Sequence, residues 1–334
     1  MSRAQLTSTV EQNTGGAVSP YVAGKNAVIN GGMDIWQRGT SFSVGNGWIY
    51  TADRWQSTEG AGTWTLSRES SVVPLGSQYS LKLTSGGTTS GQIATLIETA
   101  NVTQFQGKTI TISAQVAAST SIPMAISLYY STTADDNITN TSTAISATTG
   151  GTATPTSTTF VTLTGTYAIP STAKTLQVRI NSTGNMTSTQ AFYVGQVQLE
   201  IGSVATSFSR AGGTLSGELA ACQRYYQRWN VSSTYGFPAP NYTPASTTSI
   251  VYLNFAPVVN LRIGTGTTLE YGGSISISDS QSRYSGGTWS NGTSSTQTIT
   301  ITYTHGSAAL TQYRPYTIQA NNDATVYFAI SAEL

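Results

Sequence analysis

The sequence predicts an all-β fold: two β-sandwich or jelly-roll domains joined by one short helix, with an extended N-terminal arm. Three observations predict this class. Apolar residues alternate with Ser, Thr and Gln in many short segments, which is the period of a strand with one buried face and one wet face. Charged residues make up only 9% of the chain, against about 25% in typical proteins. Aromatic residues make up 10% and Gly numbers 33, so strand formers are interspersed with turn formers.

The N-terminal arm, residues 1–24, is polar, is interrupted by Gly and Pro, and follows neither the helical nor the strand period. Its composition fits a disordered terminus or an extended peptide that docks on a neighbouring protein, and we expect the docking arm. The first residues lack the apolar core of a signal peptide, and no apolar run is long enough for a membrane span. We therefore expect synthesis in a cytoplasm and no membrane insertion.

Residues 25–212 are predicted to form a jelly-roll β-sandwich. Within residues 109–116, every second residue is apolar, which places these side chains on one face of a strand. The same alternation recurs at 79–83, 126–130, 176–180 and 197–201. The Thr-, Ser- and Gly-rich stretch 135–155 is expected to be a surface loop. Core packing is expected for the tryptophans of this domain, Trp36, Trp48, Trp55 and Trp64.

One helix is predicted within residues 215–228, where apolar side chains recur at helical spacing. Its apolar face consists of Leu215, Leu219, Cys222 and Tyr226. Ser216 is expected to cap the N-terminus, and Glu218 in the first turn suits the helix dipole. The segment 210–213 is the expected boundary. Residues 213–334 then comprise the helix and a smaller distal β-sandwich domain, in which alternation returns at 275–277, 299–303 and 326–330.

Residue types that carry catalysis or bind metals are sparse. The only cysteine, Cys222, rules out an intrachain disulfide and a thiolate zinc site, and we expect a buried, inert thiol. The only histidine, His305, is expected to be a turn residue, and no nucleophile motif accompanies it. Asp135 and Asp136 are expected to form a solvated turn or a weak Ca²⁺ site. We therefore expect no enzyme activity, no cofactor and no structural metal.

A net charge of +1, from 15 basic and 14 acidic residues, comes without a basic patch, so we expect no nucleic-acid partner. The aromatic loops of the distal domain are better candidates for binding. Sugar rings present apolar C–H faces that stack on aromatic rings, while amides and hydroxyls bond the sugar hydroxyls. The candidate glycan-binding residues are Tyr284, Trp289, Asn291, Tyr313 and Tyr316. The alternative is that these aromatics pack contacts between domains or subunits.

Four stretches carry a family resemblance in their order along the chain. They are NAVINGGMDIWQRG (residues 26–39), YTADRW (50–55), QVQLEIGSVATSF (196–208) and ELAACQRYY (218–226). Together with the ending ISAEL (330–334), they resemble fibre and appendage proteins of tailed phages, many of them from short-tailed and marine or cyanobacterial phages. The resemblance implies a jelly roll similar to carbohydrate-binding modules, then a short helix and a smaller β domain, usually assembled as homotrimers.

The residues shared with this family are interpreted as structural, and none of them is catalytic. Asp53 and Arg54 are expected to pair beside Trp55 and lock a loop. Trp36 with Arg38 is expected to do the same at the first strand. The helix face is expected to pack around a trimer axis or against the adjacent sandwich, through Leu219, Cys222 and Tyr226.

On this resemblance we expect a structural virion protein, made in the host cytoplasm: a tail fibre or appendage that attaches the particle to a host-surface glycan. The arm would bind a tail, neck or portal protein, and the distal loops would contact the glycan. Two alternatives stay open. One is a structural component without a receptor, such as a head-decoration, neck or tail-adaptor protein, and the other is a glycan depolymerase.

Overall fold

The computed structural model describes residues 24–58, 63–138, 142–238, 242–279, 281–307 and 309–334. The predicted docking arm, apart from Gly24, lies outside these residues. The regular secondary structure of the described residues is nearly all β-strand, which confirms the predicted all-β class. It divides into two compact units, Met1–Ala221 with Leu334 and Cys222–Glu333. The division falls within the helix and not in the segment 210–213.

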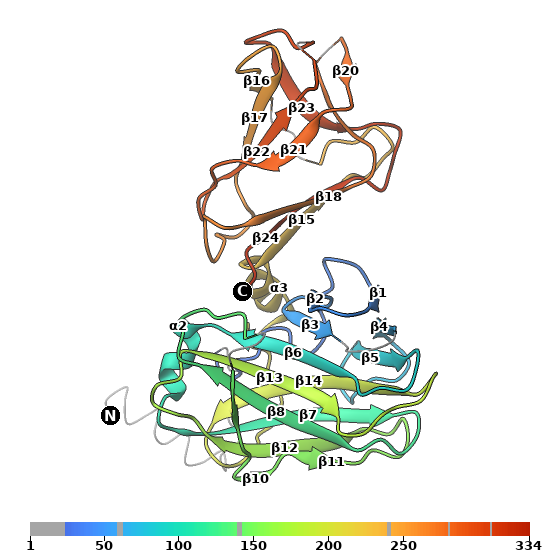
Figure 1. Ribbon diagram of the computed structural model, residues 1–334, viewed down its shortest axis with the longest axis vertical. Coiled ribbons are helices and arrows are strands. Elements are labelled where there is room, and N and C mark those ends of the chain that lie inside the picture. Colours follow the sequence, from blue (N-terminus) through green and yellow to red (C-terminus); the bar gives the residue numbers. More distant parts are fainter. Residues whose placement is uncertain (1–23, 59–62, 139–141, 239–241, 280, 308) are drawn as a thin grey trace, which may run out of the picture. The chain divides into compact units, whose positions relative to one another are not determined.

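The first unit is built from two antiparallel sheets, here called the first and the second sheet (Figure 1). The first sheet has the order β1 (Ser41–Val44), β4 (Trp64–Glu69), β5 (Ser80–Ser85), β14 (Ala191–Ile201), β7 (Thr109–Ala118), β12 (Val161–Ala168) and β10 (Thr149–Gly150). The second has the order β11 (Thr152–Ala153), β8 (Met124–Ser131), β13 (Thr175–Ser182), β6 (Gln92–Ile97), β3 (Trp55–Thr58) and β2 (Ile49–Tyr50), and β9 (Thr143–Ile145) also pairs with β8.

Both sheets of the first unit bury one face in a common hydrophobic core. Strand β13 shows how the sequence places this core. Leu176, Val178 and Ile180 lie in it, and the intervening Gln177 and Arg179 lie on the opposite face of the sheet. Each large apolar side chain buried in this way contributes about 1.5–3 kcal/mol relative to exposure. The period of two in the sequence therefore fixes which face of each strand is covered.

The stretch 135–155 is not a continuous loop as predicted, because it contains the short strands β9, β10 and β11. These strands add to the edges of sheets that already exist, with β10 pairing with β12 and β11 with β8. Segments of two or three residues carry no period of their own. They become strands only because their backbone pairs with that of a neighbouring strand.

Three short helical segments occur in the described residues: α2 (Thr99–Val102), the 3₁₀ turn η1 (Thr103–Phe105) and α3 (Leu215–Gln223). Helix α3 ends before the predicted Arg228, because Tyr226 already belongs to strand β15 (Tyr226–Asn230). The aromatic residues of this segment favour a strand, and its backbone pairs with β24 (Tyr327–Ser331).

The predicted apolar face of α3 is also wrong. Leu215 is exposed, Leu219 is half-buried, and the fully buried side chains of the helix are Glu218 and Cys222. The thiol of Cys222 is buried, as expected. The same helix also buries the carboxylate of Glu218.

The second unit has its own hydrophobic core and three small antiparallel sheets. The first of these sheets has the order β15, β24 and β18 (Thr268–Gly272). The next has the order β16 (Thr243–Pro244), β23 (Pro315–Ala320), β19 (Ile275–Ser278) and β20 (Arg283–Tyr284). The last has the order β17 (Ile250–Phe255), β22 (Ile299–Thr304) and β21 (Thr288–Asn291). Among the described residues, no helix has the length and apolar character needed to cross a bilayer.

Candidate functional site

The outer face of the second sheet carries a row of polar side chains across neighbouring strands. In register, Arg179 of β13 lies beside Ala94 of β6 and Ser127 of β8. On the far side of Ala94, Gln56 of β3 continues the same row. Because Ala94 is small, the row leaves room above it for long side chains from its neighbours and from adjacent loops.

The guanidinium of Arg179 is stacked against two aromatic rings. Its central carbon lies 4.2 Å from the centroid of the Tyr129 ring and 5.1 Å from that of Trp48. Tyr129 comes from β8, and Trp48 comes from the segment between β1 and β2. Such cation–π contacts contribute about 0.5–2 kcal/mol each and hold the guanidinium in one orientation. Trp48 is half-buried and outside the core cluster, so its expected core packing is wrong.

A buried glutamine anchors the base of this stack. The Nε of Arg179 donates a hydrogen bond of 2.6 Å to Oε1 of Gln177, whose side chain is 0% exposed. The Nε2 group of Gln177 has no hydrogen-bond acceptor among the described residues, and the same holds for Nε2 of Gln56, which is 2% exposed. A buried donor without an acceptor costs about 1–3 kcal/mol. Of the two, Gln177 lies beside the Arg179 guanidinium, to which its side chain is bonded.

A hollow of about 120 Å³ opens beside the stack. Its walls are hydroxyl, amide, aromatic and guanidinium groups, with no acidic side chain among them: Ser90, Gly91, Gln92, Ser127, Tyr129, Arg179, Asn181 and Ser182. Part of this wall is internally bonded, since Ser127 Oγ donates to Asn181 Oδ1 at 2.8 Å. Burial lowers the pKa of the Arg179 guanidinium, and the phenol of Tyr129 opposes this effect. The guanidinium stays protonated at neutral pH, because an arginine starts from a pKa above 12.

Two larger hollows lie on the first sheet, with volumes of about 480 and 250 Å³, and both are lined by Leu75, Gln196 and Phe208. Gln196 stands at a β-bulge with a φ of 51°, and its Nε2 donates to the Leu75 carbonyl at 2.9 Å. The charge of Arg210 in the smaller hollow is neutralised by Asp34 at 2.8 Å. Neither hollow has a stacked aromatic pair, so the second sheet is the better candidate site.

The residues proposed from the sequence as glycan contacts lie in the second unit, where several of them pack inward. Tyr316 is 0% exposed, and its hydroxyl accepts a hydrogen bond of 2.9 Å from the Thr311 N–H. The Tyr284 ring meets the Tyr316 ring edge-on at 5.5 Å. The Trp289 ring packs at 4.7 Å from Tyr303. These contacts lie within the second unit itself, so they are neither glycan contacts nor the alternative contacts between domains or subunits.

The other two predicted contacts differ in exposure. Asn291 is half-buried and donates from Nδ2 to the carbonyl and the hydroxyl of Thr267. Tyr313 is 76% exposed, so its ring is available to a partner. His305 follows strand β22, as expected of a turn residue, and its Nδ1 lies 2.8 Å from the Ser307 carbonyl oxygen.

Asp135 and Asp136 act as turn residues in the structure. The Asp135 carboxylate accepts from the Thr99 N–H at 3.0 Å, and the Asp136 carboxylate accepts from the Ile138 N–H at 3.2 Å. Within the described ranges, no group of three or more His, Cys, Asp or Glu side chains is arranged to hold a metal ion.

The residues interpreted as structural hold the segment 26–39 on the sandwich. Trp55 is fully buried, and its Nε1 donates to the Asn30 carbonyl at 3.0 Å. Asp53 accepts from the Gln37 N–H at 2.9 Å. Arg54 donates from Nη2 to the Leu96 carbonyl at 2.8 Å. These contacts tie the loop to its surroundings, and the expected pairing of Asp53 with Arg54 stays a prediction.

Near the first strand, Trp36 and Arg38 contact other residues, and their expected pairing stays a prediction. Trp36 donates from Nε1 to the Met33 carbonyl at 2.7 Å and stacks on Phe42. The guanidinium of Arg38 lies over the Tyr50 ring at 5.1 Å.

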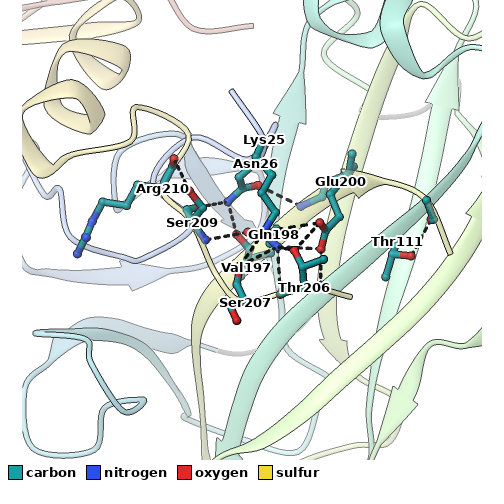
Figure 2. A network of polar contacts seen from close by, with 12 residues as sticks. Lys25, Asn26, Thr111, Val197, Gln198, Glu200, Thr206, Ser207, Ser209 and Arg210 are labelled. Atoms are coloured by element: carbon teal, nitrogen blue, oxygen red, sulfur yellow. Dashed lines mark hydrogen bonds and ion pairs between the residues drawn. The ribbon is translucent and has the colours of Figure 1, made fainter. Parts of the chain in front are cut away.

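The stretch 196–208 forms a second structural network, drawn in Figure 2. Asn26 donates from Nδ2 to the carbonyls of Val197 and Ser209, at 2.9 and 3.0 Å. Gln198 donates to Glu200 Oε1 at 2.8 Å, and the other oxygen of Glu200 accepts from the Thr206 hydroxyl at 2.6 Å. The network bonds its buried groups to one another, so it stabilises the fold and offers little to a ligand.

Sequence reasoning missed the Arg179 site, although a signal for it is present. In residues 175–182, the polar Gln177, Arg179 and Asn181 alternate with core residues, which places an arginine on the outer face of a strand. No local pattern shows that Trp48 and Tyr129 meet this arginine.

Comparison with models of known protein families gives no match, and no curated protein matches the chain. Structural neighbours are carbohydrate-binding modules. The family 22 module of Clostridium thermocellum Xyn10B is 19% identical, covers 48% of this chain and 98% of its own, and has a TM-score of 0.34. The CBM22-1 xylan-binding domain of Paenibacillus barcinonensis Xyn10C is 14% identical, with coverages of 55% and 98% and a TM-score of 0.34. TmCBM61, solved with β-1,4-galactotriose, is 7% identical, with coverages of 53% and 99% and a TM-score of 0.35.

Proposed function

We propose that the first unit binds glycans on the outer face of its second sheet. The observation that carries this proposal is the pair of rings, Trp48 and Tyr129, stacked on Arg179 beside a hollow lined by hydroxyl and amide groups. A sugar ring is amphipathic, because its C–H faces stack on aromatic rings and its hydroxyls need hydrogen-bond partners. Pockets that bind such ligands combine an apolar surface with a few placed polar groups.

The proposed activity is binding without cleavage of the glycan. Glycoside hydrolysis needs a pair of carboxyl groups that face each other across the scissile bond. The residues that line the hollow include neither Asp nor Glu. The charged group that the site does supply, Arg179, stays protonated at neutral pH and therefore does not act as a general acid or base.

The wider role that we propose is that of a structural virion protein, a fibre or appendage of a tailed phage that attaches the particle to a glycan of the host surface. Its support is the order of the four stretches that resemble this family. Assembly as a homotrimer and attachment of the N-terminal arm to a tail, neck or portal protein belong to the same proposal. Immunogold labelling of intact particles tests it: label on the tail or neck is expected, and unlabelled particles would contradict it.

Glycan binding is tested by affinity electrophoresis of the full chain against a panel of polysaccharides. Tyr129→Ala removes one ring of the stack and is expected to weaken binding about tenfold, since an aromatic contact contributes about 0.5–1.5 kcal/mol beyond the area it buries. Tyr313→Ala is the matched control, because this tyrosine is exposed and lies in the second unit. Unchanged binding by Tyr129→Ala together with loss in Tyr313→Ala would move the site to the distal loops. No binding to any polymer would reject the function.

A further inference from the structure

No acidic side chain of the described residues neutralises the charge of the half-buried Arg179. Some other basic residues of the first unit have acidic partners, as Arg210 has Asp34 at 2.8 Å and Lys82 has Glu69 at 3.8 Å. Among the described residues, Arg179 forms no ion pair, and its contacts are two aromatic rings and the amide oxygen of Gln177. A partly buried cation without a counter-ion is costly, so it indicates a partner that the chain itself does not supply.

The orientation of the guanidinium leaves its outer end available. Nε is bonded to Gln177, and the two rings hold the guanidinium plane. The two terminal nitrogens have no acceptor among the described residues, and Arg179 is part of the wall of the 120 Å³ hollow. A guanidinium fixed in this way presents a fork of N–H donors whose spacing matches the two oxygens of a carboxylate or a sulfate.

The amide beneath the guanidinium supplies no negative charge. Gln177 accepts from Arg179 through its neutral amide oxygen, and its buried Nε2 group, which has no acceptor among the described residues, lies outside the wall of the hollow. No carboxylate lines the hollow. Preorganised donors without a matching acceptor stabilise an anion more than a neutral hydroxyl, because hydrogen bonds to a charged acceptor are about twice as strong as neutral ones.

The geometry points to an acidic glycan as the ligand: a sugar that carries a carboxylate or a sulfate, with the anionic group on the Arg179 fork and a ring face on Tyr129 or Trp48. This inference rests on the proposed glycan-binding function and names its substrate class. Carboxylate and sulfate share the chemistry that the fork recognises, and the experiment separates the two.

The test compares pairs of polymers that differ only in charge, with the full wild-type chain. Polygalacturonate, alginate and hyaluronate are each paired with their carboxyl-reduced forms, and dextran sulfate is paired with dextran. Binding is measured by affinity electrophoresis and isothermal titration calorimetry at low and high salt. At least one acidic polymer is expected to bind about tenfold or more tightly than its neutral form, and this preference is expected to shrink in salt. Preference for the carboxylates or for dextran sulfate identifies the anionic group.

Substitutions of Arg179 test whether this residue causes the preference for acidic polymers. Arg179→Gln is expected to abolish the difference within each pair, and Arg179→Lys to retain only part of it, because a lysine is a point charge without a fork. Arg68→Gln is the matched control: Arg68 also stacks on a ring, that of Tyr79 at 4.4 Å, but is not part of the hollow. It is expected to keep the wild-type preference. Urea unfolding of each variant checks that the fold is intact.

The outcomes separate the two proposals. Equal binding of acidic and neutral polymers by the wild-type chain overturns the acidic ligand and leaves glycan binding standing, and this comparison needs no variant. The acidic ligand is also overturned if Arg179→Gln prefers acidic over neutral polymers as strongly as the wild-type chain does. Failure to bind any polymer, charged or neutral, removes both proposals together.

Discussion

At the scale of the residue, Glu218 shows how a single side chain joins distant parts of the first unit. Its carboxylate is fully buried and accepts hydrogen bonds from the backbone N–H groups of Asn30 and Gly212. Burial raises the pKa of this carboxyl, with a smaller contribution from Asp34, while the two hydrogen bonds and Arg210 act in the opposite direction. The balance leaves the pKa above its ordinary value.

This raised pKa predicts the sign of a pH effect on stability. The folded chain holds the Glu218 proton more tightly than the unfolded chain, so this residue lowers the free energy of unfolding as pH rises from about 4.5, its ordinary pKa, through the raised value. Glu218→Gln removes the titration. The difference in unfolding free energy, wild type minus variant, is therefore expected to fall between pH 4 and pH 7 in urea titrations. A difference that rises with pH would show that the hydrogen bonds outweigh burial.

At the scale of the element, helix α3 begins at Leu215 and is capped by Thr214, two residues before the predicted cap Ser216. The hydroxyl of Thr214 accepts a hydrogen bond of 3.0 Å from the N–H of Gly217, which is the geometry of an N-cap. Ser216 lies inside the first turn and is exposed. Both residue types cap helices well, so the sequence alone does not distinguish them.

Thr214→Ala is expected to lower the free energy of unfolding by about 1 kcal/mol, because one N–H group of the first turn loses its acceptor. Ser216→Ala is the matched control, with an expected change within about 0.5 kcal/mol. Chemical denaturation followed by circular dichroism measures both. Equal losses in the two variants would contradict the assignment of the cap to Thr214.

At the scale of the whole molecule, each unit has a large hydrophobic core of its own within the described residues, and the two cores share no residue. Leu66 is a fully buried member of the core in the first unit, and Ile301 is a fully buried member of the core in the second. Units with separate cores unfold as separate cooperative transitions unless a large apolar interface couples them.

Leu66→Ala and Ile301→Ala are each expected to destabilise one unit by about 2–5 kcal/mol, through lost burial and the cavity that remains. Each substitution is expected to shift one transition in differential scanning calorimetry and to leave the other in place. Leu75→Ala is the control, because Leu75 is 100% exposed and its loss is expected to shift neither transition. Coincident shifts of both transitions would show that the chain unfolds as one unit.

Prediction from the sequence was most successful where the signal is local. Alternation identified the longer strands, such as the one at 176–180 that corresponds to β13. It was less successful where a segment becomes regular only through its neighbour. The strands within 135–155 and the strand that begins at Tyr226 are such cases, because backbone pairing with an existing sheet decides them.

The sequence by itself determined the all-β class and the buried face of the longer alternating strands, because a period of two depends only on successive residues. Only the tertiary structure decided that Trp48, Tyr129 and Arg179 form one site. These residues come from a loop and two strands far apart in the chain. The pairing of β8 with β13 brings Tyr129 to Arg179, and the loop before β2 brings Trp48 to the same guanidinium. Strand order is set by long-range packing, and no local pattern encodes it.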